Sequence, residues 1–533
     1  MHLYSFDLRD PVFALGPWKL SFQVITLENL YGLDAAHTTL EAVNDGWRLA
    51  CSRLSWAGQQ RHAPGSLEMY ARREGEDRLL LDIRATAPHK IRAVKVLIRD
   101  LPPLRPLDML DNPRDLPEGG LIDAYPNPLR LPLFFGLLPD GTVTAVRSED
   151  PYARAKRFAV YRENFGPLAG ACTVECLHEQ DARWFDTRID VPLWVLERGV
   201  DVPAFREEQL AFDEAELGLA PWEQRGDVPR WAHDLRLCLT IHQMHWSGYI
   251  FNTYAQALDI IRFVADRIDG RHVLAYLPGW EGRYYWQYGD YRPEPLLGGG
   301  DGFARLCDGA RALGVHVMPM FGVNCANAWA PNFHTFGPSS YMKSATRNTF
   351  WGNQPDWDLK RAHDTGWQAW LHPGAPAWQT ELTRQIRELV GRFGFDGVFL
   401  DTTEVWVNDP DFNMREGLRQ LNARLRAGHP ELLVAGEDWY DGLLPILPVF
   451  QQMATWRQVP EWVGRYARLI GHICDGDPSR NSTGVHEAGC SPYVRLPQTE
   501  TYIPTLTFVD GTLEEALPEI EAVIAQAAAG RGS

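Results

Sequence analysis

The chain has 533 residues, a formal net charge of −17, 45% hydrophobic residues and 23% charged residues. The length predicts more than one domain, and the composition is typical of a globular protein. The acidic balance excludes nucleic acid and anionic membrane surfaces as expected partners, because both require clustered Lys and Arg.

Targeting and redox signals are also absent from the sequence. No apolar run approaches the ~18 residues that a membrane span needs, and the opening residues MHLYSFDLRDPVF have neither the basic nor the apolar part of a secretory signal. The eight cysteines are dispersed and show no zinc pattern. We therefore expect a cytoplasmic protein without membrane contact, metal or organic cofactor, and the sequence leaves homo-oligomerisation open.

The first part of the chain alternates apolar and polar residues with a period of two. Residues 67–72 and 78–85 form a predicted hairpin around the turn at 73–77. Further strands are expected at 95–100, at 133–138 and 142–146 around a PDG turn, and as a strand pair in 184–196. Many short strands with few helix signals predict an all-β domain, a β-sandwich over residues 1–228.

After residue 228 the rhythm changes to strand followed by helix. Continuous apolar runs at 235–246, 272–280 and 315–323 alternate with helical patterns at 253–268 and 303–314. This alternation predicts a parallel sheet covered by helices, and its unit length suits an α/β (β/α)8 TIM barrel over residues 229–533. A long insertion is expected at about 324–376.

The pattern resumes after the insertion. The helix at 381–394 precedes a strand at 395–401, and the helix at 415–430 precedes a strand at 432–438. The remaining candidates are strands near MATWR, in 468–476 and in 505–510, with a closing helix at 513–529.

Two of these strands end in an acidic residue. Asp401 shares its parity with Phe399, and Glu437 shares its parity with Ala435 on the next strand. Alternate residues of a barrel strand point inward, and the carboxyl ends of the strands hold the chemistry. Asp401 and Glu437 can therefore face one small volume, which is the arrangement that glycoside hydrolysis requires. The plainer interpretation of either residue alone is a helix cap or a solvated loop residue.

The sequence around these acids resembles a known group of enzymes. The run LHPGAPAWQTELTRQIRELVGRFGFDGVFLD followed by VAGEDW resembles the nucleophile and acid/base segments of the α-amylase superfamily and of the endo-α-N-acetylgalactosaminidases, which place a β-sandwich before the barrel. The resemblance implies that Asp401 is the nucleophile, that Glu437 is the acid/base and that the substrate is α-linked. Two family features are missing, because Phe399 replaces an arginine and no late Asn-His-Asp motif is present.

Sugar-binding residues are expected on the same rim. Tryptophan is abundant, with 20 residues, and although most tryptophans belong to cores, a flat indole also stacks on a pyranose. Two histidines three residues apart near the first strand could suggest a metal, but no third ligand accompanies them. The substrate-binding candidates are His242, His245, Trp246, Trp280, Glu281, Trp351, Trp370, His372, Glu404, Trp406, Trp439, His472 and Asp475.

Together the patterns and the resemblance predict a retaining glycosidase with carbohydrate as its partner. The resemblance implies that it acts on α-linked glycosides or oligosaccharides. An inverting glycosidase and a transglycosylase use the same carboxylates and are kept as alternatives. A carbohydrate-binding protein with a degenerate barrel is the alternative from another class.

Overall fold

The computed structural model describes residues 10–164, 168–245, 248–283, 286–349, 368–452, 459–471, 501–509 and 512–530. The chain divides into two compact units. The first unit holds residues 1–219 together with Tyr440–Gly442, and the second holds residues 220–439 and 443–533.

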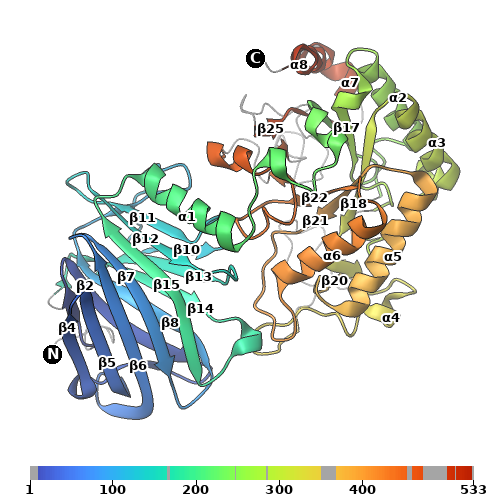
Figure 1. Ribbon diagram of the computed structural model, residues 1–533. Helices are drawn as coiled ribbons and strands as arrows, with labels where there is room; N and C mark the ends of the chain where they lie inside the picture. The colour runs from blue at the N-terminus through green and yellow to red at the C-terminus, as the bar shows by residue number, and fades with distance from the viewer. Residues whose placement is uncertain are drawn as a thin grey trace. The chain divides into compact units, whose positions relative to one another are not determined.

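The first unit is built on one antiparallel sheet of fifteen strands (Figure 1). Its main path runs in the order β10-β13-β14-β8-β2-β3-β5-β6-β7-β15-β12-β11-β9, with β1 beside β2 and β4 beside β5. The strands are β1 (Phe13–Leu15), β2 (Trp18–Thr26), β3 (Leu30–Leu33), β4 (Thr38–Val43), β5 (Gly46–Trp56), β6 (Arg61–Glu74), β7 (Arg78–Thr86), β8 (Ile91–Leu101), β9 (Arg105–Pro106), β10 (Leu121–Tyr125), β11 (Leu133–Leu137), β12 (Val143–Glu149), β13 (Lys156–Arg162), β14 (Cys172–Glu179) and β15 (Arg188–Arg198).

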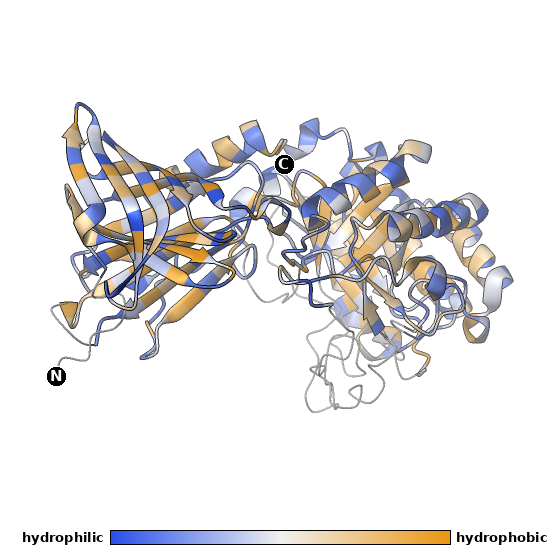
Figure 2. Cartoon of the chain, turned by 90° about the horizontal axis from the view of Figure 1, so that it is seen from below, coloured by the Kyte–Doolittle hydropathy of each residue, from blue (hydrophilic) through white to orange (hydrophobic). Residues whose placement is uncertain are grey.

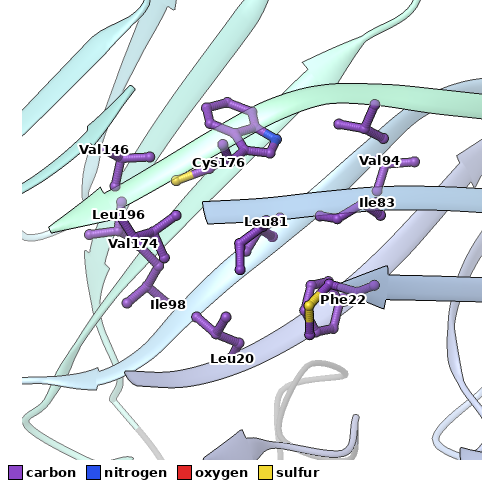
Figure 3. Packing of buried hydrophobic residues seen from close by; sticks show 14 of the residues in the cluster. Leu20, Phe22, Leu81, Ile83, Val94, Ile98, Val146, Val174, Cys176 and Leu196 are labelled. Atoms are coloured by element: carbon purple, nitrogen blue, oxygen red, sulfur yellow. The ribbon is translucent and has the colours of Figure 1, made fainter. Parts of the chain in front are cut away.

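The two halves of this sheet enclose one hydrophobic core. The predicted alternation is confirmed on β6, where Leu67, Met69 and Ala71 are buried. The rings of Phe158 on β13 and Trp194 on β15 meet at 5.9 Å, although these strands lie far apart in the sheet order. Figure 3 shows side chains from both halves gathered in this core. The packing is therefore that of a sandwich made from one continuous sheet.

Two details of the first unit differ from the predictions. The expected strand pair at 184–196 is a single strand, β15, preceded by a short 3-10 helix, η4 (Ala182–Trp184). In addition, the unpredicted helix α1 (Val202–Glu216) follows β15. Its start is well defined, because the Asp201 side chain accepts a hydrogen bond from the Ala204 N–H and a proline lies in the first turn.

The second unit contains a nine-stranded sheet in which every described pair is parallel. The order is β25-β24-β23-β22-β21-β18-β17-β16-β26. Only Pro504 separates the two edge strands along the chain, so the sheet is a nearly closed barrel. The strands are β16 (Leu237–Ile241), β17 (Val273–Leu277), β18 (His316–Gly322), β21 (Gly397–Asp401), β22 (Leu433–Glu437), β23 (Val449–Gln452), β24 (Arg468–Gly471), β25 (Tyr502–Ile503) and β26 (Thr505–Phe508).

Helices follow the first four strands of the barrel as expected. Each buries residues spaced three or four apart, as α2 does with Ala257, Ile261 and Val264, and Figure 2 shows helices with mixed hydropathy around strongly hydrophobic strands. Among the described residues between β22 and β24, the only helix is the 3-10 helix η10 (Glu461–Arg465). The regular (β/α)8 alternation is therefore not complete there. The α-helices of this unit are α2 (Tyr254–Ala265), α3 (Gly299–Ala312), α4 (Phe333–Phe336), α5 (Pro376–Phe393), α6 (Met414–Gly428), α7 (Thr512–Glu515) and α8 (Leu517–Ala529).

The insertion between β18 and α5 carries structure of its own. Its short strands β19 (Cys325–Asn327) and β20 (Gln368–Trp370) pair antiparallel, and α4 lies between them in sequence. The predicted closing helix is divided into α7 and α8. The strand expected near MATWR lies outside the described residues, and β23 just before it was not predicted. No helix in the described part of the chain has the length and apolar character needed to cross a membrane, and a cytoplasmic location remains a prediction.

Candidate active site

Asp401 and Glu437 occupy corresponding positions at the ends of neighbouring parallel strands. The register pairs Phe399 with Ala435 and Leu400 with Gly436. Asp401 and Glu437 are the next residues on β21 and β22, and they are only 6% and 8% exposed. Because in-register residues of adjacent strands point to the same side, both carboxyls reach the same end of the barrel, as the parity predicted.

The two carboxyl groups are joined directly. A hydrogen bond connects Glu437 with Asp401, and the Thr402 N–H donates to Glu437 Oε2 at 2.9 Å. Two carboxyls can form such a bond only when they share a proton. Two acids in such contact titrate as a coupled pair.

Each acid is followed by a residue in the left-handed region of the backbone. Thr402 has a φ of 65° and Asp438 a φ of 51°, which is uncommon outside glycine and especially for a β-branched residue. The turn after Asp401 is held by Asn324, whose Nδ2 donates to the Thr402 carbonyl at 2.7 Å and whose Oδ1 accepts from the Thr402 hydroxyl. This fixed turn presents the Thr402 N–H to Glu437.

A tyrosine that the sequence analysis missed completes the surroundings of Asp401. The Tyr288 hydroxyl donates to Asp401 Oδ2 at 2.8 Å, and the tyrosine is fully buried. Its ring occupies the place where a side chain on Gly322 would lie, since a Cβ built there would come within 2.1 Å of the ring. Gly322 is in register with Asp401. The aromatic density of residues 284–291, just after the second barrel strand, was the available signal.

The protonation of the site is controlled mainly by burial. Burial raises the pKa of Glu437 to about 6, with a further contribution from Asp438 and opposition from the hydrogen bonds of Thr402 and Asp401. Burial, and then the charge of Glu437, raises the pKa of Glu404 well above its usual range. Glu404 Oε2 has no hydrogen-bond partner among the described residues. The site thus contains carboxylic acids that can donate a proton near neutral pH.

Trp280 and Glu281 were predicted to contact the substrate, but both side chains are fully buried. Trp280 is fully buried between the sheet and α3, with its ring 4.9 Å from that of Phe303, and its Nε1 donates to the Met320 carbonyl at 2.8 Å. The turn before it contains Gly279 with a φ of 68°. Trp280 is therefore a core residue.

Glu281 is enclosed as well. It is fully buried, and neither carboxyl oxygen has a hydrogen-bond partner in the described part of the chain. Burial, followed by the charge of Asp401, raises its pKa well above the usual range. Glu281 is thus a neutral acid near Asp401 rather than an exposed sugar contact.

The two histidines after the first barrel strand lie together around one aromatic ring. His242 is fully buried and His245 is 7% exposed, and their rings contact Phe251 edge-on at 5.6 and 5.8 Å. No group of three or more His, Cys, Asp or Glu within the described residues is arranged to hold a metal ion.

The other predicted residues divide into buried, partly exposed and undescribed positions. Trp439 is fully buried, contacts Trp462 at 5.5 Å and donates to Gln452 Oε1 at 2.8 Å, so its role is in packing rather than sugar binding. His372 is also fully buried, and its Nδ1 accepts the Gly374 N–H at 2.9 Å. Trp370 and Trp406 remain partly exposed. Trp246, Trp351, His472 and Asp475 lie outside the described residues.

Comparisons with known proteins find similar structures but no similar sequences. No family model matches the chain, and no curated protein sequence shows a significant match. The α-N-acetylgalactosaminidase NagBb from Bifidobacterium bifidum, solved with GalNAc, matches with a TM-score of 0.63 at 14% identity, covering 96% of this chain and 88% of that one. The GH36 α-galactosidase AgaA from Geobacillus stearothermophilus matches with a TM-score of 0.51 at 12% identity, covering 95% and 75%. An α-galactosidase from Lactobacillus brevis gives 0.50 at 13% identity, covering 96% and 70%.

These matches establish the fold at low identity. They extend over nearly the whole chain, so the likeness includes both units. The neighbours are α-galactosidases and an α-N-acetylgalactosaminidase, and the predicted resemblance to the α-amylase superfamily specifically is not supported by them. The shared fold is the two-domain glycosidase fold.

Proposed function

We propose that this protein is a glycosidase that hydrolyses α-linked galactosides or N-acetylgalactosaminides. The observation that carries the proposal is the pair of buried, hydrogen-bonded carboxyls of Asp401 and Glu437 at adjacent strand ends. The sugar class is supported by the structural neighbours, which are α-galactosidases and an α-N-acetylgalactosaminidase. Paired carboxyls at the carboxyl ends of barrel strands are what such chemistry requires.

The proposed reaction proceeds in two steps with retention of configuration. An oxygen of Asp401 attacks the anomeric carbon, the glycosidic C–O bond breaks, and Glu437 gives its proton to the departing oxygen. Glu437 then removes a proton from water, and the resulting hydroxide replaces Asp401 at the anomeric carbon, which restores both acids.

The direct contact between the carboxyls supports retention over inversion. Hydrogen-bonded oxygens lie about 3 Å apart at most, whereas inverting enzymes need roughly 6.5–9.5 Å between carboxyl groups to admit a water. In retaining enzymes the two carboxyl groups lie about 5–5.5 Å apart. We expect Asp401 and Glu437 to move apart to about this distance when a glycosidic oxygen binds between them.

Two observations support the proposed division of roles. The Tyr288 hydroxyl donates to Asp401, and a donated hydrogen bond stabilises the negative charge that a nucleophile carries. Glu437, with its pKa raised to about 6, keeps a proton at mildly acidic pH and suits the acid.

Aryl glycosides provide the direct test. The wild type should hydrolyse 4-nitrophenyl α-galactoside or the corresponding α-N-acetylgalactosaminide and leave the β-galactoside intact, and NMR should show the α-anomer as the first product. Asp401→Asn should abolish hydrolysis of every substrate. A wild type that binds these sugars but cleaves none would replace the proposal with a carbohydrate-binding function, and a β-anomeric first product would establish inversion.

A further inference from the structure

Trp329 is unusually exposed for a tryptophan near an enclosed site. Its exposed fraction is 67%, compared with 39% for Trp56 and Trp184 in the first unit. Its backbone is nevertheless fixed, because the Trp329 N–H donates to Asn327 Oδ1 at 2.8 Å and the Ala330 N–H donates to the Asn327 carbonyl at 3.0 Å. The indole is therefore held in place while most of its surface faces solvent.

Asn327 connects this tryptophan to the loop that contacts Asp401. Its Nδ2 donates to the Trp286 carbonyl at 2.7 Å, and its backbone N–H donates to the Tyr288 carbonyl at 2.8 Å. Tyr288 in turn donates to Asp401. Hydrogen bonds through Asn327 thus connect the loop of the exposed Trp329 with Tyr288, whose hydroxyl contacts the candidate nucleophile Asp401.

A second aromatic ring supports the indole from the side. Trp286 lies perpendicular to Trp329 with ring centroids 6.0 Å apart, and the Arg283 guanidinium lies 4.7 Å from the Trp286 ring centroid. An edge-on contact of this kind fixes the orientation of the rings without covering both faces of either. Trp329 consequently offers a flat apolar surface whose orientation is supported by Trp286.

We propose that Trp329 is the stacking platform for the leaving-group sugar of an extended α-glycoside. This inference rests on the proposed glycosidase function. The sugar that is attacked must lie in the enclosed barrel mouth, where Asp401 and Glu437 are almost completely buried. A ring that reaches the exposed indole belongs to the other side of the scissile bond. The apolar face of a pyranose stacks on an indole in the way that other flat apolar groups do.

The test compares a substrate that has a leaving-group sugar with one that has none. An α-galactosyl fluoride carries only fluoride beyond the anomeric carbon, whereas raffinose or an α-linked disaccharide carries a sugar there. Trp329→Ala should lower kcat/KM for the oligosaccharide about tenfold, through KM, and leave the fluoride within about twofold. Trp329→Phe should recover most of the loss because it restores an aromatic face.

Trp184→Ala is the matched control, since it removes another exposed indole from the first unit, and both substrates should be unaffected. An equal loss on both substrates, no loss on either, or a wild type that cleaves the fluoride but no oligosaccharide would each overturn the platform. A wild type inactive on the fluoride itself and on every aryl α-glycoside would instead overturn the proposed function.

Discussion

At the residue scale, Tyr288 is the described side chain that most directly supports the negative charge of Asp401. A hydrogen bond to a charged group is worth about 1.5–3 kcal/mol. Tyr288→Phe should therefore lower kcat/KM roughly ten- to hundredfold. Because the donor favours the ionised carboxylate, its loss should also move the acidic limb of the pH profile to higher pH. Both effects follow from one set of kcat/KM measurements between pH 3 and 8.

Tyr291→Phe is the control for this change. Tyr291 is another buried tyrosine of the same loop, but its hydroxyl contacts the backbone of Gly322 and not a carboxylate. Tyr291→Phe should reduce stability about as much as Tyr288→Phe does, but it should leave the acidic limb of the pH profile unchanged. Equal pH profiles for Tyr288→Phe and the wild type would show that Tyr288 has only a packing role.

Glu437, the proposed acid, should determine the alkaline limb of the same pH profile. A general acid must be protonated, and burial raises the pKa of Glu437 to about 6. Activity should therefore fall as pH rises above about 6. Glu437→Gln should reduce hydrolysis of substrates with poor leaving groups roughly 10²- to 10⁴-fold. It should affect α-galactosyl fluoride far less and remove the alkaline limb, because fluoride departs without a proton.

Glu404 is the rival for the acid role, and its variant separates the two. Burial raises the pKa of Glu404 well above its usual range, which favours its neutral form, and Glu404→Gln preserves the shape of that form. We expect kcat to stay within about fivefold of the wild type on poor leaving groups, which is far less than the 10²-fold or greater loss that removal of a general acid causes. If Glu404→Gln instead loses activity on poor leaving groups while Glu437→Gln does not, the assignments must be exchanged.

The raised pKa of Glu281 makes the folded protein less stable as pH rises. A carboxyl whose pKa is higher in the folded state makes the fold less stable as pH rises from about 4.5 toward the folded value. Glu281→Gln removes this loss, so its free energy of unfolding at pH 7 should exceed that of the wild type. The difference should disappear at pH 4, where Glu281 is neutral in both states. A gain of equal size at both pH values would refute the explanation.

At the scale of secondary-structure elements, strand β18 ends in Gly322, and the ring of Tyr288 occupies the space where a larger side chain would lie. A Cβ on Gly322 would come within 2.1 Å of the Tyr288 ring. Gly322→Ala should cost about 1–3 kcal/mol of stability through overpacking and should move the acidic limb as Tyr288→Phe does. Gly391→Ala on α5 is the control, since nothing lies within 4 Å of the added Cβ, and the pH profile should stay unchanged. A normal profile for Gly322→Ala would separate Gly322 from the position of Tyr288.

The elements also show how far sequence reasoning reaches. Strands β21 and β22 were predicted because apolar runs ending in an acid follow amphipathic helices, and their register brought Asp401 and Glu437 together as parity required. Trp280 is enclosed by contacts with Phe303 and the Met320 carbonyl, and such tertiary contacts are not encoded in local periodicity. Tyr288 was missed for a related reason, since the path of a long loop decides which of its aromatic residues reaches the barrel mouth.

At the scale of the whole molecule, the chain has two separate hydrophobic cores. The core of the sandwich consists entirely of residues between Leu15 and Leu196, whereas residues such as Phe399 and Leu433 are buried in the barrel. Their patterns differ as well, with alternation in the first core and continuous apolar strands in the second. This contrast is the basis of the predicted division at residue 228, and the first compact unit holds residues 1–219 together with Tyr440–Gly442.

Two cores predict two unfolding transitions in calorimetry, since each compact unit can unfold cooperatively by itself. Trp194→Ala removes a fully buried ring from the sandwich core and should cost about 3–5 kcal/mol in one transition. Glu281→Gln should raise only the other transition at pH 7, and loss of enzymatic activity on heating should follow that second transition. If both variants shift one common transition, the two units unfold as a single cooperative structure.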